Sequence, residues 1–191
     1  MIDGAEIAAE NASSWQQNIA HVPQSIFLTD GSFAQNIALG TTQDTIDLDT
    51  VKRAAEQAQI ADFIGKQPLG YDHAIGENGV RLSGGQRQRI GIARALYRNA
   101  NVLFFDEATS ALDSATEQSV MTAIANLQPD LTIIMIAHRL STLANCTQII
   151  ELDAGQITRQ GTFSEIVGDG NLLGNSLSPF FQICKENAFD K

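Results

Sequence analysis

The chain has 191 residues, of which 43% are hydrophobic and 18% charged, a mix typical of a globular domain with a buried core. Its formal net charge of -10 argues against a nucleic-acid partner, because a surface that binds nucleic acid needs a basic patch. Two cysteines are too few for a disulfide framework, no signal peptide is visible, and no apolar run approaches the roughly 18 residues of a membrane-spanning helix.

The first predicted strand is short and ends at a proline. Ile19 to Val22 reads IAHV, and Pro23 cannot continue the hydrogen-bond ladder of a strand. Gln24 follows directly, so its amide is expected at the end of that strand. Taken alone, Gln24 is an ordinary polar loop residue.

Two helical segments come next. Apolar residues recur at helical spacing around Phe33 to Leu39 and again from Leu48 to Ile64. Asp47 is placed to cap the second segment, because an aspartate before the first helical residue accepts hydrogen bonds from the first turn. The turn Pro68-Leu69-Gly70 then breaks the pattern, and a glycine-rich loop from Tyr71 to Arg81 follows.

The segment Ser83-Gly84-Gly85-Gln86 opens a further helix. Ser83 is a good N-cap, and Gln86 three residues later completes the spacing of a capping box. Glycine lowers helix propensity by about 1 kcal/mol, so a cap alone does not explain two glycines. Bare backbone N–H groups at a helix N-terminus bind anions. The segment therefore predicts a phosphate site, to which Arg87 and Arg89 add positive charge; the alternative is a well-capped helix and nothing more.

Val102 to Phe105 is a run of bulky apolar residues that ends in two acids, Asp106 and Glu107. Such a run is typical of a buried strand in a parallel sheet, where ligands bind at the carboxyl ends of the strands. One carboxylate can hold Mg²⁺ while its neighbour polarises a water. The alternative is a strand followed by a solvated acidic turn.

A turn, a helix and a strand follow in that order. The turn is Ser110-Ala111-Leu112-Asp113, and the helix begins at Ser114 with a second capping-box spacing. Leu131 to Ile136 reads as another buried strand, and His138 lies just beyond it. A histidine beside an apolar strand is usually structural, but this one falls at the same sheet edge as the two acids.

The C-terminal part predicts two strands and two helices. Gln148 to Leu152 and Gln156 to Gln160 read as strands around a glycine turn, and Gly161 to Val167 reads as a short helix. Pro179 to Ala188 predicts a last helix with its bulky apolar residues packed inward.

In this order, the motifs resemble the nucleotide-binding domain of an ABC transporter. LSGGQ is similar to the signature motif of the family, VLFFDE to its Walker B strand and SALD to its D-loop, while Gln24 and His138 stand in its Q-loop and H-loop positions. The resemblance implies an α/β fold of the P-loop NTPase type (ABC ATPase), with a mostly parallel sheet flanked by helices. It also implies an inserted helical subdomain at about residues 32–82, within one partial domain that spans 1–191.

The resemblance implies a role for each motif residue. Glu107 would be the general base or water-positioning group, Asp106 would serve Mg²⁺, and Gln24 would contact Mg²⁺ and the attacking water. His138 would contact the γ-phosphate of ATP. A nucleotide held by a second domain, arranged head to tail, would meet Ser83, Gly84, Gly85, Gln86 and Asp113. Positioning and charge neutralisation of this kind are what phosphoryl transfer requires.

One motif of the family is missing. The P-loop G-x-x-x-x-G-K-[ST] does not occur, and Gly65-Lys66 is followed by Gln67. The family's adenine-stacking aromatic residue, which lies further upstream, is missing too. The first residues, MIDGAEI, resemble the hairpin that follows the phosphate-binding helix of the family, so we expect the N-terminal part of the domain to be absent. We therefore expect ATP hydrolysis from the parent protein and no ATP binding by this chain alone.

The predicted function is the ATP-hydrolysing motor of an ABC exporter. The resemblance implies a second nucleotide-binding domain and a transmembrane domain as partners, at the cytoplasmic face of the membrane. Ile75 to Gly79 resembles an exporter-type Gly-Glu element, although an ordinary glycine turn reads the same way. One alternative is a truncated, non-catalytic fragment that cannot bind ATP. The other is a soluble ABC ATPase of DNA repair, which the acidic charge and the lack of heptads between Gln24 and Ser83 disfavour.

Overall fold

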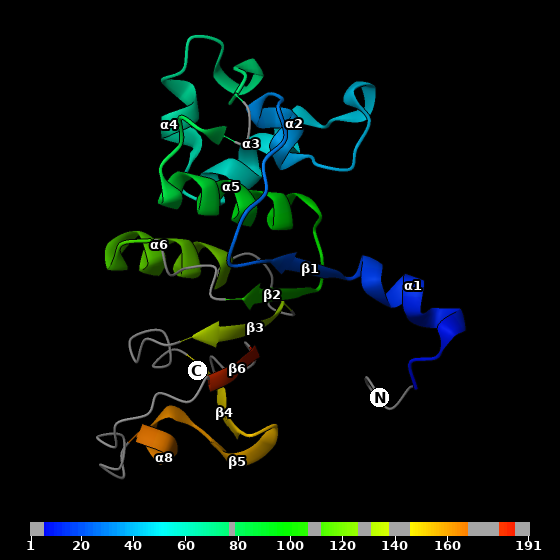
Figure 1. Ribbon diagram of the computed structural model, residues 1–191, viewed down its shortest axis with the longest axis vertical. Coiled ribbons are helices and arrows are strands. Elements are labelled where there is room, and N and C mark those ends of the chain that lie inside the picture. The colour runs from blue at the N-terminus through cyan, green and yellow to red at the C-terminus, as the bar shows by residue number, and fades with distance from the viewer. Residues whose placement is uncertain are drawn as a thin grey trace, which may run out of the picture.

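The computed structural model describes residues 6–76, 79–106, 112–125, 131–137, 146–167 and 180–185 (Figure 1). In chain order the elements are α1 (Ala9–Gln17), β1 (Ile19–Val22), α2 (Phe33–Ile37), η1 (Gln43–Thr45), α3 (Leu48–Gln57), α4 (Ala61–Gly65), η2 (Gly70–Asp72), α5 (Gly84–Tyr97), β2 (Val102–Asp106), α6 (Ser114–Ala125), β3 (Thr132–Ala137), β4 (Gln148–Asp153), β5 (Gln156–Gly161), α8 (Phe163–Val167) and β6 (Phe180–Lys185).

One sheet runs through the fold in the order β1-β2-β3-β6-β4-β5. The strands β1, β2 and β3 are parallel, with Val22 opposite Phe105 and Asp106 opposite Ile136. The strand β6 is antiparallel to both of its neighbours, and β5 is antiparallel to β4. The strands β1, β2 and β3 thus form the parallel part of the sheet that the sequence predicts.

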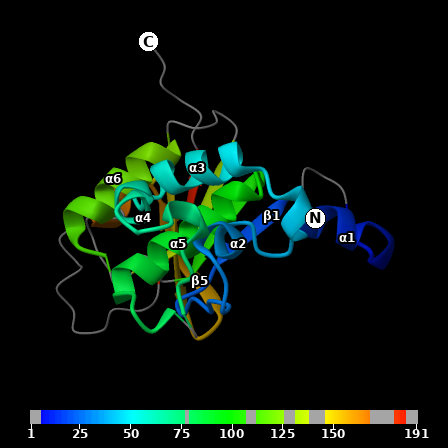
Figure 2. The same cartoon turned by 90° about the horizontal axis from the view of Figure 1, so that it is seen from above.

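The helix α5 lies between two layers. It packs on the sheet through β1, and α2 and α3 pack on its other side (Figure 1). In Figure 2 the helices α2, α3 and α4 overlie α5. This sandwich explains why consecutive residues of α5, from Ile90 to Ala93, are all buried, since a helix that is covered on both sides needs apolar residues all round.

The helices α2, α3 and α4 share the main core of the protein with the sheet. Phe33, Ile37, Val51 and Ile64 are buried in it. The predicted segment Leu48 to Ile64 is two helices rather than one. The backbone turns at Gln59, whose φ of 56° is incompatible with a continuing right-handed helix.

The C-terminal hairpin has a small core of its own. β4 and β5 are joined by Ala154 and Gly155, both with positive φ, as a two-residue hairpin turn of type I′ requires. Cys146, Ile149 and Ile166 form a buried cluster separate from the main core.

The predicted last helix, Pro179 to Ala188, is wrong: Phe180–Lys185 is the strand β6. A short apolar run fits either structure, and here two neighbouring strands supply hydrogen-bond partners along its backbone.

Candidate functional site

The carboxyl edge of the parallel strands brings two predicted site residues to one side of the sheet. Asp106 is the last residue of β2, and Gln24 lies two residues beyond the end of the adjacent strand β1. Gln24 is exposed and Asp106 is half-buried. Their amide and carboxylate oxygens are the ligand type that Mg²⁺ prefers, and Mg²⁺ usually takes only one or two protein carboxylates along with phosphates and waters.

Two further predicted site residues directly follow described strands in the sequence. Glu107 directly follows β2, and His138 directly follows β3. Both lie outside the described residues, so their catalytic roles stay predictions. Within the described residues, no group of three or more histidine, cysteine or acidic side chains could hold a metal ion.

The start of α5 has the predicted capping box. The Gln86 N–H donates to Ser83 Oγ (3.2 Å), and the Ser83 N–H donates to Gln86 Oε1 (2.9 Å). Ser83 and Gly84 are exposed, and Gly85 is half-buried. The first N–H groups of a helix have no acceptor within it, so the Gly84 and Gly85 amides are available to an anion. Figure 1 shows that α5 begins on the side of the molecule where β1, β2 and β3 end.

Arg89, which the sequence predicts to add positive charge near this helix start, donates hydrogen bonds to two backbone carbonyls. Its Nη1 donates to the carbonyl oxygen of Gln59 (2.8 Å), and its Nε donates to that of Gly85 (3.4 Å). The left-handed turn at Gln59 follows α3, so Arg89 ties the first turns of α5 to the end of α3.

Sequence reasoning missed the contacts that fix the segment after Gln24 to α5. Arg94 Nη1 donates to the carbonyl of Phe27 (3.0 Å), and its Nε donates to that of Asn36 (2.9 Å). Burial lowers the pKa of the Arg94 guanidinium, and its buried Nη2 has no partner among the described residues. A Cβ on Gly91 would stand 2.3 Å from Ile26 Cδ1, so this glycine allows the segment to pack directly on the helix.

Two signals in the sequence could have indicated the packing of this segment on α5. One is a glycine, Gly91, inside an otherwise helical pattern, which often marks a close approach of another segment. The other is Arg94, a charged residue in an apolar stretch. Through Gly91 and Arg94, the segment that follows Gln24 is packed on α5, the helix that Ser83 caps.

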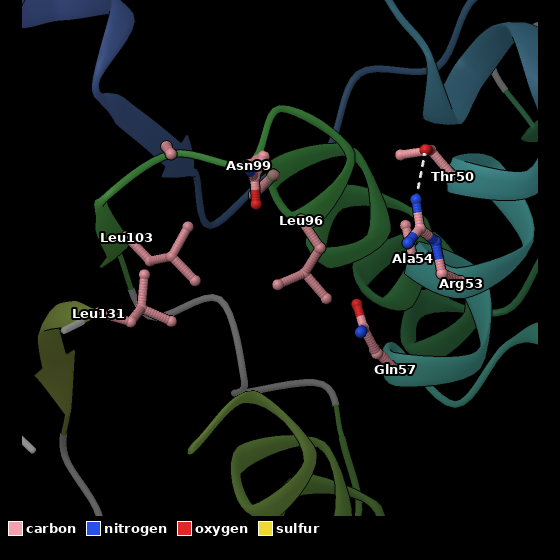
Figure 3. A pocket seen from close by; sticks show the side chains of 10 residues that line it. Thr50, Arg53, Ala54, Gln57, Leu96, Asn99, Leu103 and Leu131 are labelled. Atoms are coloured by element: carbon pink, nitrogen blue, oxygen red, sulfur yellow. Dashed lines mark hydrogen bonds between the residues drawn. The ribbon is translucent and has the colours of Figure 1, made fainter. Parts of the chain in front are cut away.

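A cavity of about 450 Å³ lies away from these residues, beside the start of β2 (Figure 3). Its floor includes Leu96, Leu103 and Leu131, and its rim includes Arg53, which donates to Thr50 Oγ1 at 2.8 Å. It opens near the amino ends of β2 and β3, whereas Asp106 is at the carboxyl end of β2. The cavity therefore does not belong to the candidate site.

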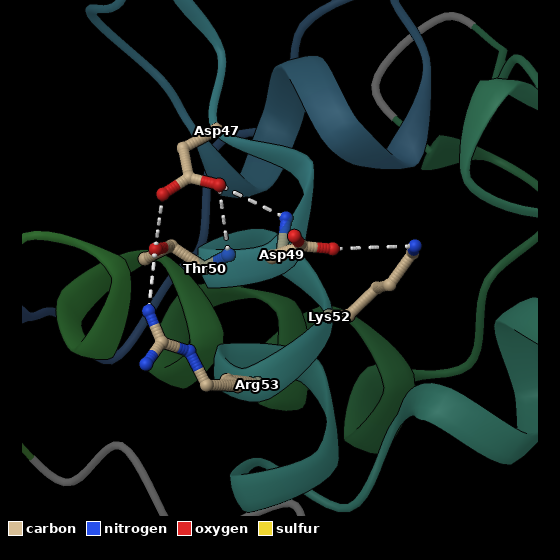
Figure 4. A network of polar contacts seen from close by, with 5 residues as sticks. All are labelled: Asp47, Asp49, Thr50, Lys52 and Arg53. Carbon is tan, nitrogen blue, oxygen red and sulfur yellow. Dashed lines mark hydrogen bonds and ion pairs between the residues drawn. The ribbon is translucent and has the colours of Figure 1, made fainter.

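Asp113 caps α6 and corrects the prediction that Ser114 does so. The Thr116 N–H donates to Asp113 Oδ1 (3.0 Å) and the Thr116 hydroxyl to Oδ2 (2.6 Å), while Ser114 is the first helical residue. These bonds from Thr116 lower the pKa of the exposed Asp113 carboxyl. Asp47 caps α3 in the same way through Thr50, beside Arg53 (Figure 4).

The parallel sheet, the capped helix with its open glycines and the helices inserted between β1 and α5 together define a P-loop NTPase-type domain of the ABC class. This chain belongs to the ABC transporter family, whose sequence profile matches residues 1–110. The ATP-dependent lipid A-core flippase of Photobacterium profundum is 46% identical over 167 residues, which are 87% of this chain and 28% of the flippase. The protein of the same name from Albidiferax ferrireducens is 46% identical over 175 residues, 92% of this chain and 30% of the relative.

A solved structure agrees with the sequence relatives. The bacterial Atm1-family ABC exporter with ATP bound superimposes with a TM-score of 0.83 and 41% identity, covering 90% of this chain and 30% of that chain. The predicted family and fold are therefore confirmed. The chain spans less than a third of the length of the relatives it matches, and no helix among its described residues is long and apolar enough to cross a membrane.

Proposed function

We propose that this chain is part of the ATP-hydrolysing motor of an ABC exporter, with residues 32–82 as its helical subdomain. The observation that carries the proposal is the parallel register, which puts Gln24 and Asp106 at one sheet edge, while α5 begins with an exposed and a half-buried glycine. Relatives named as ATP-dependent flippases and as an ATP-bound exporter support the same conclusion. The flippase names state a cargo and the name of the exporter structure states none, so the proposal covers the motor and leaves the cargo open.

In the proposed mechanism, each residue positions a group or neutralises charge. Asp106 and Gln24 would supply oxygen ligands to Mg²⁺, and Gln24 would also orient the attacking water. Glu107 accepts a proton from that water, and His138 donates a hydrogen bond to the γ-phosphate. ATP, bound with Mg²⁺, supplies the phosphoryl group. The chain would contribute by stabilising the negative charge that develops on this group in the transition state.

The signature residues act on a second subunit in this proposal. Ser83, Gly84, Gly85 and Gln86 present a helix start to the nucleotide held by the P-loop of a partner domain, and Asp113 links the two sites. The two glycines fit this role, because they carry no side chain of their own over their amides and Gly84 is exposed. The pair of domains would be held at the cytoplasmic face of the membrane by a transmembrane domain.

The missing P-loop sequence limits what the chain does alone. Without its backbone N–H groups and lysine, the β- and γ-phosphates lose their main ligands. We expect calorimetric titration of the chain with ATP and Mg²⁺ to show no binding at micromolar concentrations. A micromolar Kd at neutral pH would contradict the proposal at this point.

The catalytic assignment is tested in a chimera that joins the P-loop segment of an ABC relative to this chain. Glu107→Gln keeps the size of the side chain and removes the proton acceptor, so turnover should fall by about 100-fold or more. ATP affinity should stay unchanged in a binding assay. Asp44→Asn, which removes an exposed carboxylate on η1, is the control and should leave turnover unchanged. Normal turnover of the Glu107 variant would show that another residue accepts the proton from the attacking water.

The head-to-tail pairing is tested by mixing two inactive chimeras. One carries Ser83→Arg, and the other lacks the P-loop lysine. In a mixed dimer one composite site has both lesions and the other has neither, so ATPase activity should reappear on mixing. No activity at any ratio, with mixed dimers shown to form, would exclude the pairing.

A further inference from the structure

The cavity of about 450 Å³ beside the start of β2 has a polar wall and an apolar floor. One wall comes from α3, where Thr50, Arg53 and Gln57 recur at helical spacing and therefore lie on the same face of the helix. The floor includes Leu103 of β2 and Leu131, which are 1% and 6% exposed, and Figure 3 shows both across the cavity from Gln57. An apolar floor with a few polar groups at one side, in a cavity of this size, is typical of a small-molecule site.

Arg53 brings a positive charge to the rim of this cavity. Its guanidinium donates to Thr50 Oγ1 (2.8 Å), and the Thr50 hydroxyl donates to Asp47 Oδ2 (2.6 Å), so Thr50 lies between the two charges (Figure 4). The hydrogen bonds from Thr50 are the main cause that lowers the pKa of Asp47, and the charge of Arg53 contributes least. Within the described residues Arg53 makes no ion pair, whereas the neighbouring Lys52 pairs with Asp49 at 3.6 Å.

Gln57 adds a second polar group on the same wall. It is half-buried, and its amide has no hydrogen-bond partner in the part of the chain that the structure describes. The amide NH₂ and the remaining N–H groups of Arg53 are donors, so this wall suits an acceptor. A carboxylate matches the planar fork of a guanidinium with two parallel hydrogen bonds.

We propose that this cavity binds a small monocarboxylate with an apolar chain or ring. Its carboxylate lies against Arg53 and Gln57, and its apolar part covers Leu96, Leu103 and Leu131. The site is independent of the proposed function, because it opens at the amino ends of β2 and β3 while Asp106 stands at the carboxyl end of β2. A ligand there contacts both α3 and the sheet, so it stabilises the packing of one on the other.

The first experiment locates the ligand. The probe is sodium octanoate, titrated into the full chain with isotope-labelled leucine methyl groups. The methyl signals of Leu96, Leu103 and Leu131 should shift together, with a single Kd of about 1 mM or lower, as expected for a ligand of about ten non-hydrogen atoms. Leu69 is the control, because it is 66% exposed and does not line the cavity. Equal shifts at Leu69, or no shift at the three floor leucines, would overturn the proposal.

The second experiment tests the contact with the carboxylate. Arg53→Gln removes the charge and the fork and should raise the Kd of octanoate by about tenfold or more, whereas Arg53→Lys keeps the charge and should raise it by about threefold. Lys52→Gln is the matched control and should leave the Kd unchanged, because this charge is paired with Asp49 and does not line the cavity. Octanamide, which has the same chain and no charge, should bind about tenfold more weakly than octanoate. Equal Kd values for the Arg53→Gln and Lys52→Gln variants, or for the two probes, would contradict the assignment.

The third experiment changes the charge behind Thr50. Asp47→Asn keeps a side-chain oxygen for the cap of α3 and removes a negative charge that a bound carboxylate would face, so the Kd of octanoate should fall by about threefold. Glu10→Gln removes an equal charge from α1, which Figure 1 shows apart from α3, and should leave the Kd unchanged. Urea unfolding of each variant confirms that the titrated chain is folded. An unchanged or higher Kd in the folded Asp47 variant would place the carboxylate away from Arg53 and overturn the proposal.

Discussion

The starts of α2 and α5 have the same capping box and different neighbours. At α2 the Gln35 N–H donates to Ser32 Oγ (3.2 Å) and the Ser32 N–H donates to Gln35 Oε1 (2.8 Å). At α5 the corresponding distances between Ser83 and Gln86 are 3.2 and 2.9 Å. By cap geometry alone, the two helix starts cannot be told apart.

The residues inside the two boxes separate them. Phe33 and Ala34 follow Ser32 and are buried, at 1% and 3% exposure. Gly84 and Gly85 follow Ser83, and Gly84 is exposed. The first two residues of α2 pack in the core, whereas the first residue of α5 is exposed and the second is half-buried. The capping box is thus a structural device at both places, and the open glycines are what suggest a ligand at one of them.

The largest contrast is expected at the first residue of each helix. Phe33 packs edge-on to Phe63 and stacks near His73, so Phe33→Ala should cost about 3–5 kcal/mol of unfolding free energy. Gly84→Ala, at the matching position of α5, should stabilise the chain by up to about 1 kcal/mol through helix propensity. Urea unfolding of the two variants measures both values. A large loss at Gly84 would show that this turn, too, is closed by packing.

The next effect concerns the contact between Gly91 of α5 and Ile26, which lies two residues after Gln24. Gly91→Ala puts a Cβ against Ile26, which should cost about 1–3 kcal/mol by overpacking. Ile26→Ala removes the obstructing atoms, so the double variant should recover part of that loss. The measurement is a double-mutant cycle of unfolding free energies. Strict additivity would mean that Ile26 does not pack on Gly91 in solution.

How much the sequence could predict depends on how local each feature is. The start of α5 and the strand β2 were predictable because a cap, a glycine pair and an apolar run that ends in acids are written in consecutive residues. The cap of α6 was misplaced by one residue, since Asp113 and Ser114 are both good N-caps and the pattern does not choose between them.

Features that depend on distant partners could not be predicted. The bond from Arg94 to the carbonyl of Phe27 joins residues 67 positions apart, and nothing in either local pattern specifies it. The sequence predicts a helix where β6 lies, because the strand structure depends on pairing with β3 and β4, which lie elsewhere in the chain. For the same reason the motifs of the candidate site were predictable, but the contacts that connect the region of Gln24 to α5 were not.

A smaller effect tests whether the two capping boxes are equal in stability. Ser32→Ala and Ser83→Ala should each cost about 1 kcal/mol, because each removes the acceptor for one helical N–H. In the P-loop chimera, only the Ser83 variant should lower ATPase activity. Thermal unfolding and turnover, measured on the same samples, separate the two properties. Equal loss of activity in both variants would reduce Ser83 to a structural cap.

The aspartate caps of α3 and α6 offer a second comparison of this kind, because they have the same geometry and only one of them belongs to a predicted motif. Asp47 and Asp113 each accept a hydroxyl bond of 2.6 Å from a threonine three residues on (Figure 4 shows the first). In both cases the bonds from that threonine lower the pKa of the carboxyl from its ordinary value of 3.8. The cap geometry again does not distinguish Asp113, which the sequence predicts to be a D-loop residue, from Asp47.

The smallest expected effect is a pH dependence of the stability that both aspartate caps contribute. A carboxyl whose pKa is lowered by folding stabilises the native state above its unfolded pKa, and this contribution is lost as the pH falls through the folded pKa. Both caps should contribute fully at pH 6 and weaken below about pH 4. Asp47→Asn and Asp113→Asn should each lower the Tm at pH 6, and the difference from the wild type should shrink by pH 3. Asp44→Asn removes an equal charge where the side chain caps no helix, and it controls for net charge. A Tm difference that stays constant over this range would show that hydrogen bonding to the ionised carboxylate does not stabilise these helix starts. A change at Asp47 alone would show that Asp113, the predicted D-loop residue, does not stabilise the start of α6 in this chain.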